Sequence, residues 1–175
     1  MMNVKFLNPF VEAAFTVLEA EVGIKNAQRG ALSLQYSACT ANDVTALISI
    51  VGQVQGIVLY SLAEETAITI VSTILGQPFK KLDDLAQSGI GELANVISGQ
   101  ASNLLAEAGY EFKISPPTLI LGKGTLISTL DFDRLQVPIV TELGEIQIHL
   151  ALREIQPNPV WDMPVVNTGA IAPEG

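Results

Sequence analysis

The stretch from Leu85 to Ala108 constrains the fold most, because its apolar residues recur at the spacing of an amphipathic helix. The apolar members are Leu85, Ile90, Leu93, Ile97, Ala101, Leu104, Leu105 and Ala108. Asp83 or Asp84 stands where the N-terminal cap of such a helix belongs. The pattern therefore predicts a long helix that packs one face against the core of the domain.

A second stripe on the same predicted helix is polar or small and steps by four and three residues. Its members are Ser88, Glu92, Asn95, Gly99 and Ser102, and side chains at these spacings share one helical face. A glycine inside a helix costs roughly 1 kcal/mol relative to alanine. Close approach of a partner surface to the backbone is one use for the missing side chain of Gly99. We expect this stripe to face solvent.

These residues resemble the motif of a known family. Ser or Asp, three residues, Glu, two residues and Asn on a helix is the pattern of the CheC, CheX and FliY phosphatases of bacterial chemotaxis. Ser88, Glu92 and Asn95 match that pattern position for position. The chain shows one Glu-x-x-Asn pair, which is typical of CheX-type members, whereas CheC-type members usually show two.

The surrounding sequence is also similar to this family. The segment 48–59, the helical stretch after it that ends at Gly76, and an opening helix over 8–21 carry the likeness. The resemblance to CheX-type members extends over most of residues 3–155. The family tends to place a proline at a fixed distance after the Asn. Here Pro116 and Pro117 stand one or two residues short of it, which leaves the loop after the helix open.

The resemblance implies hydrolysis of the aspartyl phosphate of a CheY-like receiver protein. The receiver already holds the phosphoryl group and its Mg²⁺, so we expect this chain to bind no cofactor or metal itself. What the receiver lacks is an ordered water, and the amide of Asn95 can hold one in line with phosphorus. Glu92 can pair with a receiver lysine and fix the docking register. Ser88 and Gly99 are expected to contact the partner.

Two alternatives to an enzyme remain open from the residues. A non-enzymatic module could bind a receiver or a motor component through the same helix without hydrolysis. A structural domain that has lost any partner would also carry these residues. From spacing alone, an acid and an amide on a solvated helix face need no function.

The resemblance also implies a single α/β domain of the α+β type over residues 1–155, mainly an antiparallel sheet with helices on one face. Prolines recur at 157, 159, 164 and 173, and we predict a partly disordered tail over 156–175. CheX-type relatives form dimers through a shared sheet, and an unguarded edge strand can pair with its copy. We expect a symmetric homodimer. The alternative is a monomer whose edge the tail covers.

Composition excludes several classes of protein. The chain has 18 acidic and 9 basic residues in 175, a formal charge of −9, whereas nucleic-acid binding relies on clustered Lys and Arg. No apolar run approaches the length of about 20 residues that crosses a bilayer, so we expect no membrane partner. The single cysteine, Cys39, cannot form an internal disulfide, and the cytoplasm is the expected compartment.

Local signals predict the remaining elements. A first helix is expected to begin at Asn8-Pro9 and end at Gly23, and a second to begin at a capping box over 61–64 and end at Gly76. Predicted strands span 31–36, 46–51, 56–62, 118–122, 125–132, 135–141 and 145–152. His149 is expected on the sheet surface. The Gly122-Lys123-Gly124 sequence lacks a full phosphate-loop pattern and is predicted to be a hairpin turn.

Overall fold

The computed structural model describes residues 4–36, 39–129 and 133–155. Its helical elements are η1 (Val4–Phe6), α1 (Leu7–Val17), the π-helical turn η2 (Leu18–Val22), α2 (Glu64–Leu75) and α3 (Asp84–Glu107). Its strands are β1 (Gln28–Arg29), β2 (Ser33–Gln35), β3 (Cys39–Thr40), β4 (Val44–Gly52), β5 (Val54–Leu62), β6 (Phe112–Ile114), β7 (Thr118–Leu121), β8 (Leu126–Ile127), β9 (Arg134–Thr141) and β10 (Gly144–Glu154). The predicted tail over 156–175 lies outside the described residues.

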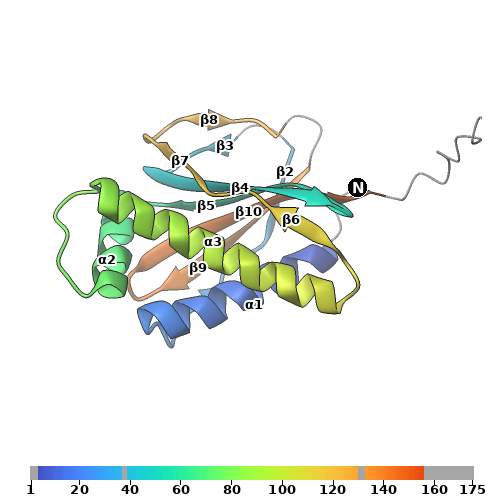
Figure 1. The fold of residues 1–175 in the computed structure, drawn as a ribbon. Helices are drawn as coiled ribbons and strands as arrows, with labels where there is room; N and C mark the ends of the chain where they lie inside the picture. Colours follow the sequence, from blue (N-terminus) through green and yellow to red (C-terminus); the bar gives the residue numbers. More distant parts are fainter. Residues whose placement is uncertain (1–3, 37–38, 130–132, 156–175) are drawn as a thin grey trace, which may run out of the picture.

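The strands form an eight-stranded antiparallel sheet in the order β1-β9-β10-β5-β4-β6, in which β2 also pairs with β9 and β7 with β4. The helices lie on one face of this sheet, and the small β3–β8 ribbon lies on the other side (Figure 1). The α+β class with helices on one face is therefore confirmed. The predicted hairpin is β4–β5, with only Gln53 between the two strands.

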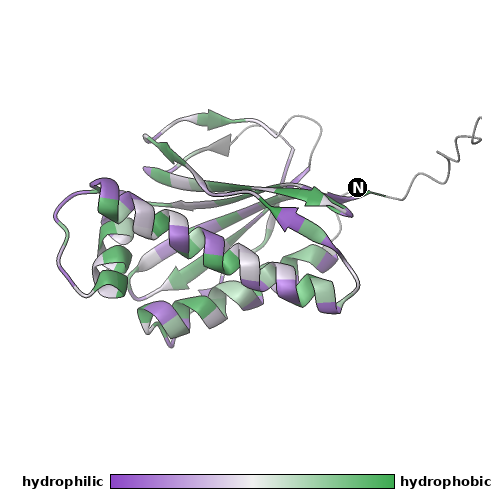
Figure 2. Cartoon of the chain, in the orientation of Figure 1, coloured by the Kyte–Doolittle hydropathy of each residue, from purple (hydrophilic) through white to green (hydrophobic). Residues whose placement is uncertain are grey.

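The core fills the space between the sheet and the helices. Ile146, Ile148 and Leu150 of β10 are buried there, as their alternation predicts. The long helix α3 packs against α1 and the sheet, and Figure 2 shows hydrophilic and hydrophobic residues interleaved along it. Two predicted core positions are wrong: Leu85 is 52% exposed, and Ala108 caps the helix in an exposed position. A step of four residues from buried Ile90 leads back to Ala86, so Ala86 occupies that stripe instead.

The helix ends agree with the sequence at three positions and differ at two. Asp83 caps α3, and Gly23 and Gly76 end their helices in the left-handed conformation, with φ of +78° and +64°. The capping box at Ser61 is wrong, because Ser61 lies in β5 and bonds Thr45 across the hairpin; the carboxylate of Asp43 accepts from the Glu64 amide instead. The Asn8 cap is also wrong, because η1 extends the helical segment forward and α1 begins at Leu7.

Three predicted strands are shorter than their patterns suggested. Residues 31–36 contribute only β2, 118–122 contribute β7, and within 125–132 the described strand is β8. The short strands β1, β3 and β6 were not predicted. Strands of two or three residues carry no periodicity of their own and are fixed by the partner strand, so their sequences give little signal.

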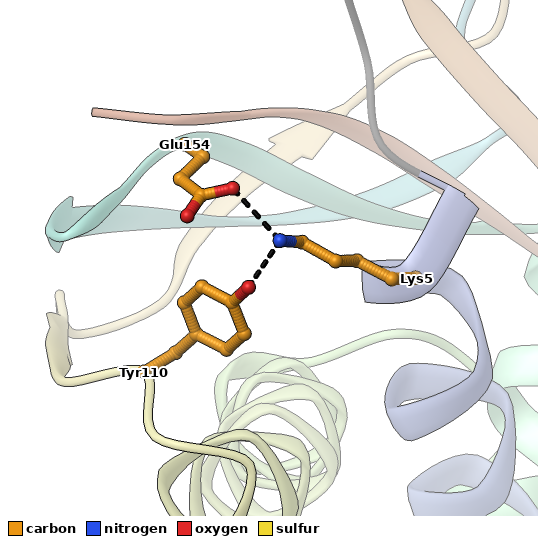
Figure 3. A network of polar contacts seen from close by, with 3 residues as sticks. All are labelled: Lys5, Tyr110 and Glu154. Atoms are coloured by element: carbon orange, nitrogen blue, oxygen red, sulfur yellow. Dashed lines mark hydrogen bonds and ion pairs between the residues drawn. The ribbon is translucent and has the colours of Figure 1, made fainter. Parts of the chain in front are cut away.

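A polar cluster joins three distant segments at the C-terminal end of α3 (Figure 3). The ammonium group of Lys5 donates to the hydroxyl of Tyr110 and, at 2.8 Å, to the carboxylate of Glu154. The Glu154 hydrogen bond, followed by that of Tyr110, raises the pKa of Lys5. The Tyr110 ring also meets Phe6 edge-on, with 5.4 Å between ring centroids. The cluster ties the chain leaving α3 to the start of α1 and the end of β10.

His149 is buried, not on the sheet surface as predicted. It lies on the face of β10 opposite the helices and is 4% exposed, and its Nδ1 has no hydrogen-bond partner in the part of the chain that the structure describes. The neighbouring strands place Leu59 and Arg134, which are equally buried, on the same face. Burial, and then the charge of Arg134, lower the pKa of His149 from 6.5 to about 4.

We expect this histidine to make the fold sensitive to acid. Above pH 6.5 the imidazole is neutral in both states; as pH falls from 6.5 toward 4, the unfolded chain takes up a proton that the folded chain refuses. The free energy of unfolding should then drop by about 2 kcal/mol between pH 7 and 4.5 through this group alone. Urea unfolding of wild type and of His149→Leu, each at pH 7 and at pH 4.5, measures this drop in the free energy of unfolding. An equal pH dependence in the two proteins would contradict the assignment.

Candidate functional site

Helix α3 holds the predicted site residues, and several contacts fix its rotation. The carboxylate of Asp83 accepts from the Ala86 amide at 3.0 Å at the N-terminal end. In the middle, the buried hydroxyls of Ser98 and Tyr60 lie 2.8 Å apart and join the helix to β5. Burial raises the pKa of Tyr60, which keeps its hydroxyl protonated. Ser98 belongs to the buried face of α3, while Glu92 is exposed and Asn95 is half-buried at the border between the two faces.

The structure brings the predicted stripe together on one outward face of α3. Ser88 and Glu92 are exposed, whereas Asn95, Gly99 and Ser102 are half-buried. Among the described residues, the side chains of Ser88, Glu92 and Asn95 make no hydrogen bond or ion pair. The polar groups of this stripe are therefore available to a partner without breaking an internal bond.

Three glycines of α3 differ in what surrounds them. A Cβ at Gly99 would meet nothing within 4 Å, so the helix is bare at this point. A Cβ at Gly89 would lie 2.3 Å from Cγ2 of Val71 in α2, and one at Gly91 would touch Pro117 at 3.4 Å. Gly89 thus allows α2 to approach α3 closely. Gly89 and Gly91 both lie within the motif segment 88–95. Their positions in the sequence do not predict that they contact Val71 and Pro117.

Glu92 lies between two hollows on either side of the stripe. One hollow, of about 470 Å³, is lined by Asp84, Gln87, Ser88, Gly91, Glu92, Pro117 and Leu119. The other, of about 340 Å³, is lined by Glu21, Ile74, Leu75, Gly89, Glu92, Leu93 and Val96. Pro117 lies beside α3 in the connection from β6 to β7.

Among the described residues, every charged side chain that lines the two hollows is acidic. A cationic group on a partner would therefore be attracted to this side of α3. Within the described part of the chain, no group of three or more His, Cys, Asp or Glu is placed to hold a metal ion. None of the helices among those residues is long and apolar enough to cross a membrane.

Comparison with known proteins gives consistent relatives. The curated CheY-P phosphatase CheX of Thermotoga maritima is 28% identical over 154 residues, which are 87% of this chain and 98% of that protein. A crystal structure of a CheC-like superfamily protein from Shewanella sp. PV-4 matches with a TM-score of 0.79 and 29% identity, over 87% of this chain and 99% of the other.

A third relative was solved together with a partner. The CheX–CheY–BeF3–Mg²⁺ complex from Borrelia burgdorferi contains a chain that matches with a TM-score of 0.75 and 25% identity, over 87% of this chain and all of that one. The family model of the chemotaxis phosphatase CheX matches residues 44–140, which include β4, β5, α2 and the whole of α3. Because that match covers more than half of the chain, the protein belongs to the CheX family of chemotaxis phosphatases.

Proposed function

We propose that this protein hydrolyses the aspartyl phosphate of a CheY-like receiver protein. The observation that carries the proposal is the stripe on α3, where the side chains of Glu92 and Asn95 make no hydrogen bond or ion pair to another described residue. The chain also has a curated relative that is a CheY-P phosphatase. The test is the decay of a phosphorylated receiver from the same organism with and without this protein. Unchanged decay despite tight binding would favour the non-enzymatic module instead.

In the proposed reaction, water attacks phosphorus, the bond from phosphorus to the aspartate oxygen breaks, and inorganic phosphate leaves. The receiver supplies the phosphoryl group and its Mg²⁺, so this chain brings no cofactor. The amide of Asn95 accepts from and donates to the attacking water and holds it in line. A carboxylate one turn away, that of Glu92, pairs with a receiver lysine and fixes the register of the complex.

Ser88 and Gly99 complete the proposed contact surface at either end of this pair. Ser88 is exposed one turn before Glu92 and offers a hydroxyl to the partner. Gly99 carries no side chain one turn after Asn95, and a Cβ there would meet nothing within 4 Å. A receiver can then approach the helix more closely at Gly99 than any side chain would allow.

Filling the space at Gly99 should separate binding from stability. Gly99→Ala and Gly99→Leu should each raise the free energy of unfolding by up to about 1 kcal/mol, because both residues favour helices over glycine. Receiver affinity should fall with side-chain size, least for Ala and most for Leu. Urea unfolding and titration with a beryllofluoride-loaded receiver measure the two effects. Unchanged affinity for Gly99→Leu would mean that the partner stays away from this residue.

We also propose a homodimer in which two copies pair through strand β2. Among the described residues, this strand pairs with β9 alone. Leu34 within it, and Leu32 and Tyr36 beside it, are exposed at 44%, 42% and 73%. The opposite edge carries Pro116 and Pro117 between β6 and β7, and prolines protect an edge from pairing. The exposed apolar residues at β2 therefore support pairing through this edge, which is opposite the edge formed by β6 and β7.

A charge on this edge should block assembly. Leu34→Lys should convert the dimer to a monomer, because a lysine on an edge strand opposes its pairing with a second copy. The same substitution at exposed Leu126 on β8 serves as the control and should leave the dimer intact. Light scattering gives the masses. A monomeric wild type, or a dimeric Leu34→Lys, would rule out pairing through β2.

A further inference from the structure

The hollow between η2, α2 and α3 is an apolar groove beside the proposed docking stripe. We call it the α2–α3 groove and define it by Glu21, Ile74, Leu75, Gly89, Glu92, Leu93 and Val96. Leu75, which lines the groove in the last turn of α2, is 39% exposed. The groove thus leaves apolar surface in water, which is typical of a binding surface.

The groove depends on the close approach of α2 to α3. Cγ2 of Val71 occupies the place where a side chain at Gly89 would stand, so no residue of α3 fills the space between the helices there. Leu93 and Val96 continue the α3 wall beyond Gly89, while Ile74 and Leu75 supply the α2 wall. Its size, about 340 Å³, suits one or two side chains better than a whole helix.

Two features identify the occupant. Glu92 lines the groove and also stands on the stripe proposed to dock the receiver, so a receiver on that stripe covers the groove mouth. Of the described residues that line the groove, the charged ones are Glu21 and Glu92, and none is Lys or Arg. The matching ligand is an apolar side chain with a basic residue beside it.

We propose that the α2–α3 groove is a second contact for the phosphorylated receiver, which inserts an apolar side chain between the helices and pairs a neighbouring Lys or Arg with Glu21. This proposal rests on the proposed function, because it takes the receiver as the partner. The groove acts in binding and not in the chemical step, since it lies beside the stripe and not at Asn95. It therefore selects among receivers that share the same phosphorylation chemistry.

The experiment uses the full chain and the receiver from the same organism. Leu75→Ser and Glu21→Lys are the test variants, because Leu75 lies outside the core cluster and Glu21 is exposed. Leu126→Ser, at a residue 70% exposed on β8, is the matched control. Catalysed decay is measured over a range of receiver concentrations, and affinity is measured with the receiver loaded with beryllofluoride and Mg²⁺.

We expect both variants to raise KM and the dissociation constant about tenfold, the effect of losing one buried aliphatic contact or one charge pair, with kcat unchanged. Leu126→Ser should match wild type. Unchanged KM and affinity in both test variants would overturn the groove proposal while leaving the phosphatase intact. If both test variants bind the receiver more weakly than wild type does, and wild type never accelerates decay, the phosphatase is overturned and the groove is supported. A wild type that neither binds nor accelerates would overturn both.

Discussion

Replacing Asn95 with alanine should abolish the acceleration of receiver dephosphorylation while leaving receiver binding nearly unchanged. The amide acts on the attacking water, which is held in line only as the transition state forms, so its removal lowers kcat and not affinity. The loss should be about 100-fold or more, the scale seen when one positioned hydrogen-bonding group is removed from an active site. Decay of the phosphorylated receiver gives the rate, and beryllofluoride-loaded receiver gives the affinity.

Asn103 offers a matched control for this substitution. It is an exposed asparagine on the same helix, two turns further on and one turn beyond Gly99. Asn103→Ala should retain full activity, and both variants should unfold at similar urea concentrations. Accelerated decay by Asn95→Ala at the wild-type rate would remove Asn95 from the reaction.

Replacing Glu92 should weaken the complex itself. A charge-assisted contact to a receiver lysine contributes to binding before the chemical step, so Glu92→Ala should raise the dissociation constant about 10- to 100-fold. At low receiver concentration, the rate of catalysed dephosphorylation by Glu92→Ala should fall by the same factor. Raising the protein concentration should restore much of that rate. Wild-type affinity should also decrease with added salt more steeply than that of Glu92→Gln, which keeps the shape without the charge.

Glu107, an exposed acid in the last turn of α3, is the control for Glu92. Glu107→Ala removes the same net charge and should leave the dissociation constant near the wild-type value. A comparable loss in both variants would assign the effect to the overall acidity of the protein. Normal binding by Glu92→Ala would refute the docking role.

The sequence predicted the long helix and its outward stripe because both follow from local periodicity. Steps of three and four residues place Ser88, Glu92 and Asn95 on one face wherever the helix packs, and the structure finds them there. The alternation of β10 and the pairing of β4 with β5 were predicted for the same reason. The roles of the stripe residues came from the family motif, and these roles stay predictions.

Features that depend on distant residues could not be read from local patterns. Gly89 and Gly91 gain meaning only from Val71 and Pro117, which the fold brings against them. His149 alternates like a surface residue, yet it is buried together with Leu59 and Arg134, which lie on the same face of the adjacent strands. The groove beside Glu92 arises from two helices and a π-helical turn, so no single segment carries its signal.

The measurement closest to the central claim is the decay of a phosphorylated CheY-like receiver, from the same organism, in the presence of catalytic amounts of this protein. The receiver is labelled on its aspartyl phosphate, and the release of inorganic phosphate is followed with wild type, Asn95→Ala and buffer alone. The account predicts that wild type speeds release through many turnovers, whereas Asn95→Ala leaves it at the rate of buffer. Equal decay in all three samples, with wild type bound to the receiver, would contradict it.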